Sequence, residues 1–156
     1  MKLGVSSYSF SKYIAQTGAS YLDICNEAKR IGYDGIEFID LSLDIQPAAS
    51  LQELARTIRS HCESIGLEIA AYTVGADFLN RGPGEIDRVK GQADIAALLG
   101  AKVMRHDAAW SLPEGMNWRE AIDLIKEPIR EVASYAQEKG IKTCTENHGY
   151  VLQDSH

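Results

Sequence analysis

The sequence predicts an α/β fold of the (β/α)8 TIM-barrel type, with only the first five strands and four helices of the barrel in this chain. One pattern occurs four times: an amphipathic helix, a glycine, and then a short apolar strand. The four glycines are spaced at intervals of roughly 34 to 40 residues, about the length of one βα unit. They are Gly32, Gly66, Gly100 and Gly140. Long loops follow the strands and tight turns follow the helices, as expected for a barrel whose site lies at the carboxyl ends of its strands.

Strict alternation of strands and helices implies parallel strands joined by right-handed crossovers. An open doubly wound sheet is the alternative arrangement. A complete barrel typically needs about 250 residues, so we expect these 156 residues to form one domain, 1–156, that is the N-terminal part of such a barrel. The residues from 150 to 156 are too few for the helix of a fifth unit.

The expected elements follow from runs of apolar residues and from their period. Strands are expected at 3–8, 35–40, 67–72, 102–106 and 141–146. Helices are expected at about 20–31, 50–65, 86–97 and 117–136, each with an apolar stripe.

Local signals fix the ends of two of these helices. Ser50 with Glu53, and Asn117 with Glu120, have the spacing of capping boxes. Pro128 lies inside the last helix, where it is expected to kink or split it.

The composition excludes several classes of protein. Apolar residues make up 45% and charged residues 24% of the chain, as in ordinary globular domains. The net charge of −6 disfavours nucleic-acid and anionic-membrane partners, and the short apolar runs predict no membrane span. The three cysteines, Cys25, Cys62 and Cys144, are expected to be buried reduced thiols, which indicates a cytoplasmic protein.

Polar side chains stand where the predicted strands end, and parallel α/β folds form their sites at that rim. The seven candidates are Tyr8, Glu37, Tyr72, His106, Asp107, Glu146 and His148. The first strand is followed by no glycine-rich phosphate loop, and the chain has no Gly-x-Ser-x-Gly elbow. A nucleotide-binding fold and an α/β-hydrolase are therefore disfavoured.

Each of these candidates also has a structural interpretation. Glu146 is either a site carboxylate or a solvated acid at the end of a strand, and Glu37 either contacts substrate or pairs with a neighbouring strand. His106 is either a substrate ligand beside Glu146 or a strand-end histidine bonded to a loop. Tyr8 either lines the site or belongs to the core.

Three segments carry a resemblance to a known family: Gly32-Tyr33-Asp34-Gly35-Ile36-Glu37-Phe38, the strand end Met104-Arg105-His106, and the run from Gly140 to Gly149 that contains Glu146-Asn147-His148-Gly149. Together they resemble the xylose-isomerase-like TIM barrels. That group includes sugar phosphate isomerases and epimerases, inosose dehydratases and, more distantly, endonuclease IV.

The resemblance implies a metal-dependent isomerase or epimerase of keto-sugars or sugar phosphates. Glu146 would bind a divalent metal, Mn²⁺, Mg²⁺ or Co²⁺, and would also act as the catalytic acid and base. His106, Glu37, His148 and Tyr8 would contact the sugar. The other metal ligands of the family would lie beyond residue 156, so the isolated chain is expected to retain metal poorly and to be inactive or nearly so.

Two alternatives stay open. One is a lyase of the inosose dehydratase type, and the other is a non-catalytic half-barrel that serves as an oligomerisation module. In either case an unclosed barrel leaves the edges of its first and fifth strands unpaired, which predicts a homo-oligomer formed through them.

Overall fold

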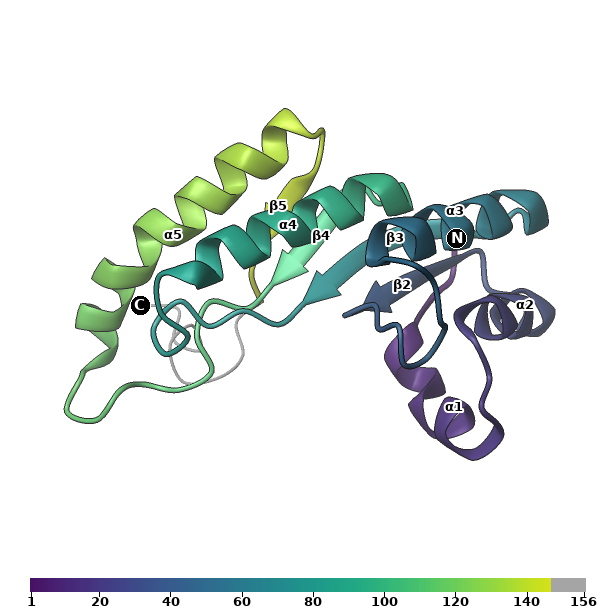
Figure 1. Cartoon of the computed structure of the whole chain (residues 1–156), viewed down its shortest axis with the longest axis horizontal. Helices are drawn as coiled ribbons and strands as arrows, with labels where there is room; N and C mark the ends of the chain where they lie inside the picture. The colour runs from purple at the N-terminus through teal and green to yellow at the C-terminus, as the bar shows by residue number, and fades with distance from the viewer. Residues whose placement is uncertain (147–156) are drawn as a thin grey trace.

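The computed structural model describes residues 1–146. This part of the chain holds five parallel strands, which form one sheet in the order of the sequence (Figure 1). The strands are β1 (Gly4–Ser6), β2 (Gly35–Ile39), β3 (Glu68–Val74), β4 (Val103–His106) and β5 (Lys142–Cys144). A doubly wound sheet reverses its strand order at a switch point, whereas the sequential order found here is that of a (β/α)8 barrel.

Four helices lie between the consecutive strands, as predicted. They are α2 (Tyr21–Ile31), α3 (Leu51–Ile65), α4 (Gly84–Leu99) and α5 (Trp118–Glu138). The turns that lead from each helix into the next strand span only two or three residues, whereas the loops that leave β2, β3 and β4 are much longer. The longer loops therefore gather at the carboxyl ends of the strands.

The two faces of the sheet differ in what covers them. Ile36, Phe38, Tyr72 and Met104 are fully buried, and they belong to one core with apolar residues of α2, α3, α4 and α5. Side chains alternate along a strand, so the intervening residues point to the opposite face. That opposite face carries polar groups and is the one that faces inward in a closed barrel.

The first strand is shorter than predicted. It ends at Ser6, and residues Ser7–Phe10 form a 3₁₀ turn, labelled η1, instead of continuing the strand to Tyr8. The Ser6 hydroxyl accepts a hydrogen bond from the Tyr8 amide at 3.3 Å, which favours the turn at this point. A further short helix, α1 (Ser11–Thr17), follows and was not predicted, because none of its residues is buried and it has no apolar stripe.

The predicted caps are present with one difference. Asn117 and Glu120 form a complete capping box at the start of α5. Ser50 caps α3 through the Glu53 amide, but the Glu53 carboxylate accepts from the amide of Ala49 instead of that of Ser50. Helix α5 is not split at Pro128, because one helix runs from residue 118 to residue 138.

The cysteines were predicted correctly at two positions and wrongly at the third. Cys25 and Cys62 are fully buried free thiols, with their Sγ atoms 3.5 Å apart between α2 and α3. Cys144 is exposed. It lies on β5, whose outer side has no neighbouring strand among residues 1–146.

A membrane-spanning helix is not found in residues 1–146, where every helix is too short or too polar to cross a bilayer.

Candidate functional site

The carboxyl ends of β2, β4 and β5 bring polar side chains together at one rim of the sheet. We call this rim the C-terminal rim and define it by Asp40, Arg105, Asp107 and Glu146. The register aligns Ile39 with Thr73 and Thr73 with Arg105, and it aligns Arg105 with Cys144. Because side chains alternate, Glu37, Thr73 and Arg105 share the face opposite the helices.

An ion pair joins the ends of β4 and β5. Arg105 Nη2 lies 2.8 Å from a carboxylate oxygen of Glu146 and 3.0 Å from Oδ1 of Asp107. The side chains of Arg105 and Asp107 are mostly buried, whereas that of Glu146 is 61% exposed. The Glu146 carboxylate is thus held in place on one side by a guanidinium and open to solvent on the other.

Glu37 lies on β2, on the same face. Its carboxylate accepts a hydrogen bond of 2.5 Å from the hydroxyl of Thr73 on β3. This contact is the structural interpretation considered for Glu37, a strand carboxylate paired with a polar group of its neighbour. The structure places Glu37 in the middle of β2, two residues before its carboxyl end, and its role as a substrate contact stays a prediction.

His106 does not meet Glu146. It is fully buried, and the register pairs it with the buried Val74 on the helix-covered face of the sheet. Its Nδ1 lies 2.7 Å from the Asp107 carbonyl oxygen, and its ring packs edge-on against Phe78. The expectation that His106 lies beside Glu146 is therefore wrong, because alternation turns adjacent residues at a strand end to opposite faces.

Burial also determines the charge of His106. It lowers the pKa of the imidazole below its ordinary value of 6.5, and the contact with the Asp107 carbonyl opposes that shift only in part. Nε2 is buried and has no hydrogen-bond partner among residues 1–146. His106 is thus a neutral side chain packed on the helix side of the sheet.

Tyr8 and His148 are the other two residues expected to contact the sugar. Tyr8 lies in the 3₁₀ turn after β1 with its side chain 73% exposed, so it sits beside the rim and not at the end of a strand. His148 lies outside the described residues.

Asp40 is a rim residue that the sequence analysis did not single out. It follows β2 directly, and its φ of 33° makes it the one non-glycine residue with positive φ in residues 1–146. Its Oδ2 accepts a hydrogen bond of 3.2 Å from the Gly75 amide. The rule that selects Glu146, an acid as the last residue of an expected strand, also selects Asp40, the last residue of the expected strand 35–40.

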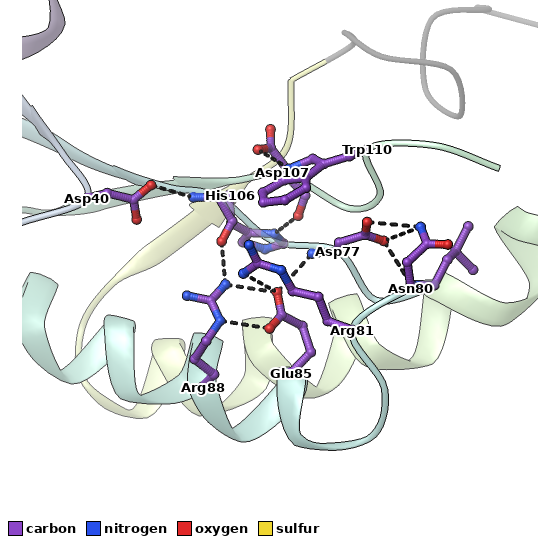
Figure 2. A network of polar contacts seen from close by, with 11 residues as sticks. Asp40, Asp77, Asn80, Arg81, Glu85, Arg88, His106, Asp107 and Trp110 are labelled. Carbon is purple, nitrogen blue, oxygen red and sulfur yellow. Dashed lines mark hydrogen bonds and ion pairs between the residues drawn. The ribbon is translucent and has the colours of Figure 1, made fainter. Parts of the chain in front are cut away.

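Gly75 brings three loops together. A methyl group added at its Cα would lie 3.0 Å from Cζ2 of Trp110, 3.6 Å from Oδ2 of Asp40 and 3.9 Å from Oδ2 of Asp107. The two carboxylates therefore flank Gly75, and the Trp110 indole, which donates to Asp107 at 3.1 Å, stands against it (Figure 2). Only a residue without a side chain allows this close approach.

A buried ion pair on α4, between Glu85 and Arg88, supports the loop that follows β3 and begins at Gly75; Figure 2 shows the two side chains. Glu85 on α4 is nearly fully buried and forms two hydrogen bonds with Arg88, of 2.7 and 2.8 Å. Arg88 also donates to the Gly75 carbonyl, and Glu85 accepts from the Asp77 amide at 2.9 Å. Burial alone would raise the pKa of Glu85, but the bonds from Arg88 and Asp77 outweigh it and lower that pKa.

The described residues do not fit a divalent metal. Residues 1–146 contain no group of three histidine, cysteine or acidic side chains placed to hold one ion. The carboxylate predicted to bind the metal, Glu146, is paired with Arg105. We therefore derive no chemical step through a metal from these residues.

The sequential parallel sheet with an acidic C-terminal rim defines the first half of a (β/α)8 barrel. The chain belongs to the xylose isomerase-like TIM barrel family, whose model matches residues 25–154. A search of curated proteins finds no match.

Three solved structures show the same fold. A sugar phosphate isomerase/epimerase from Parabacteroides distasonis is 17% identical, with a TM-score of 0.66 over 97% of this chain and 59% of its own. The probable 3-DHS dehydratase AsbF from Bacillus anthracis is 19% identical, with a TM-score of 0.73 over 99% of this chain and 55% of its own. The IOLI protein, solved with a binding zinc atom, is 21% identical, with a TM-score of 0.66 over 93% of this chain and 51% of its own.

The chain thus spans between half and three fifths of the length of these structures. The match confirms the predicted fold class and family. The three structures named above are described as a sugar phosphate isomerase/epimerase, a probable dehydratase and a protein with a binding zinc atom.

Proposed function

We propose that the protein is an isomerase or epimerase of keto-sugars or sugar phosphates, in which Glu146 moves the proton. The observation that carries this proposal is the carboxylate at the end of β5, fixed by Arg105 yet 61% exposed on the open face of the sheet. A base in that position is held by one partner and reachable by a ligand.

The proposed chemistry follows from the two charges. The Glu146 carboxylate takes the proton from the carbon next to a ketose carbonyl, and the electron pair of that C–H bond moves onto the carbonyl oxygen. Arg105, 2.8 Å from Glu146, supplies a positive charge close to that developing negative charge. Return of the proton to the other face gives the epimer, and its return to the neighbouring carbon gives the isomer.

A divalent metal, Mn²⁺, Mg²⁺ or Co²⁺, is proposed only from the family. Glu146 would be its ligand, and the metal would polarise the carbonyl when bound. Because the described residues hold no three-donor group, we expect little turnover from these residues alone.

A dehydratase is the second candidate, favoured by the structural match to AsbF. Its first step is the same removal of a proton next to a carbonyl, followed by loss of a hydroxyl from the adjacent carbon. The product then carries a C=C bond conjugated to the carbonyl, which absorbs in the ultraviolet and which an epimerase does not form.

The assay uses a panel of keto-sugars, their phosphates and an inosose, with and without Mn²⁺, Mg²⁺ or Co²⁺. Carbon NMR identifies an isomer or epimer, and ultraviolet absorption identifies an enone. Products that appear with the wild type and vanish with Glu146→Gln support the proposal. Products formed equally well by Glu146→Gln would refute it.

We propose further that the chain forms a homo-oligomer through its strand edges. Among residues 1–146, β1 pairs only with β2 and β5 only with β4, so one side of each strand is left without a neighbour. Such edges favour pairing with a second copy. Sedimentation that shows a monomer at high concentration would exclude this arrangement, including the non-catalytic oligomerisation module.

A further inference from the structure

A cavity of about 330 Å³ lies beside the C-terminal rim, between the turn that follows β1 and the loop that follows β2. Its polar lining comes from Ser7, Tyr8, Ser11 and Asp40, and Ile14 and Ile39 form part of an apolar wall. The volume lies within the range of small-molecule sites, about 300–1,000 Å³. The pair formed by Arg105 and Glu146 does not line it.

The Asp40 backbone is held in an unfavourable conformation by several bonds. Its amide donates to the Thr73 carbonyl at 2.9 Å, and its Oδ2 accepts from Gly75. The next two amides, of Leu41 and Ser42, donate to the buried hydroxyls of Tyr72 and Tyr21 at 3.3 and 3.0 Å.

A positive φ at a non-glycine residue is strained, and it persists only where the surroundings impose it. Glycine would avoid this strain, and what the Asp40 carboxylate offers the fold in return is the 3.2 Å bond from the Gly75 amide. The conformation places the exposed Asp40 carboxylate at the cavity. Within residues 1–146 its second oxygen, Oδ1, makes no hydrogen bond (Figure 2).

Ser7 adds a second polar group from the opposite side. Its side chain is buried, and its Oγ accepts a hydrogen bond of 3.0 Å from the Ile39 amide. A hydroxyl has one hydrogen to donate, and that of Ser7 is not used by another described residue. The cavity thus presents one fixed acceptor, Asp40, and one fixed donor, Ser7, above an apolar wall.

We propose that this cavity binds a polyol segment of a neutral ligand, with the Asp40 carboxylate accepting hydrogen bonds from its hydroxyl groups. Hydroxyls match a carboxylate acceptor and a serine donor, and the C–H groups of the same segment match the apolar wall. Among residues 1–146 no lysine or arginine lines the cavity, so these residues offer a phosphate no lining cation to offset the Asp40 charge. The inference rests on the proposed action on sugars for the identity of the ligand.

The test uses xylitol, which carries the hydroxyls of a sugar but no carbonyl to react. Titration of the wild type, followed by amide NMR, is expected to shift the Ile39 amide, which is bonded to Ser7 at the cavity. Asp40→Asn keeps an oxygen for Gly75 but loses the charge, and it is expected to weaken xylitol binding about ten- to hundredfold. The surface control Asp123→Asn on α5 is expected to bind xylitol as the wild type does.

Asp40→Gly separates binding from folding. Glycine suits a φ of 33°, so this variant is expected to melt at the same or a higher temperature than the wild type and still lose xylitol binding. Xylitol that binds Asp40→Asn and Asp40→Gly as tightly as the wild type would overturn the proposal. The proposal would also be overturned if xylitol caused no amide shifts at the cavity of the wild type, or if inorganic phosphate bound there more tightly than xylitol.

This experiment is independent of the reaction. If xylitol binding depends on Asp40 but the protein does not react with keto-sugars, the cavity proposal is supported and the proposed function is refuted. A reaction on keto-sugars that depends on Glu146, together with xylitol binding that the Asp40 substitutions do not change, would support the proposed function and refute the assignment of the cavity.

Discussion

Arg105 and Glu146 face each other across the ends of two adjacent parallel strands, with Nη2 and a carboxylate oxygen 2.8 Å apart. The same guanidinium lies 3.0 Å from Asp107. The pair joins β4 to β5 on the open face of the sheet and fixes the one carboxylate to which we assign proton transfer.

Arg105→Gln removes the positive charge between the two acids. We expect the proposed reaction to slow about tenfold or more, because Glu146 is no longer oriented and the developing oxyanion loses a nearby charge. We expect the free energy of unfolding to fall by about 2 kcal/mol, because Glu146 is mostly exposed but the mostly buried Asp107 loses a charged partner.

Assays of kcat and KM together with urea unfolding measure both effects. The matched control is Arg130→Gln, which breaks an exposed ion pair with Glu127 on α5. An Arg105→Gln enzyme as fast as the control would argue against this role for Arg105.

Glu85→Gln breaks the buried pair beneath the Gly75 loop. It leaves Arg88 without its charged partner, and we expect a loss of about 2 kcal/mol in the free energy of unfolding. Breaking a fully buried ion pair destabilises a protein by more, about 3–5 kcal/mol. We expect a smaller loss here because the Arg88 side chain is 35% exposed. Urea unfolding checks this, with Glu138→Gln at the end of α5 as the control; equal stability of the two variants would contradict it.

The buried His106 predicts how stability depends on pH. Its pKa in the folded protein lies below the ordinary 6.5 because it is buried. As the pH falls below about 6.5 the unfolded chain takes up a proton at His106 that the folded chain does not, so the free energy of unfolding falls.

His106→Phe keeps a ring against Phe78 and removes the titration. We expect its unfolding free energy to depend less on pH between about 6.5 and 5 than that of the wild type. An unchanged slope in His106→Phe would show that another group titrates.

The cysteines are expected to differ in reactivity. Alkylation of the native protein should modify Cys144, which is exposed, and should spare Cys25 and Cys62, which are buried in contact with each other. That contact and burial raise the pKa of Cys25, which further suppresses its thiolate. Mass spectrometry should count one modified thiol in the native protein and three after unfolding; rapid native modification of Cys62 would contradict the packing of α2 on α3.

Periodicity and glycine spacing were enough to predict the sheet, because each βα unit carries its own apolar stripe and its own helix-ending glycine. The four predicted helices and the five predicted strands are present, although β5 ends at Cys144, two residues before Glu146, where the sequence predicted a strand to 146. The 3₁₀ turn at Tyr8 and helix α1 were missed, because a serine hydroxyl and a few exposed residues give no periodic signal.

The partners of the site residues were harder to predict. His106 and Arg105 are neighbours in sequence, and the register decides which of them faces Glu146. Asp40 could have been selected by its place at the end of an expected strand, but its positive φ could not be predicted, because it depends on contacts with Tyr72, Gly75 and Tyr21, which are far away in the sequence.

The most direct test of the central claim is solvent exchange at the carbon next to the carbonyl of a keto-sugar. The protein is incubated in D₂O with D-xylulose, with and without Mn²⁺, and deuterium incorporation is followed by NMR. We predict incorporation faster than in buffer with the wild type and about a hundredfold slower, or at the buffer rate, with Glu146→Gln. Exchange by Glu146→Gln at the wild-type rate would contradict the assignment of proton transfer to Glu146.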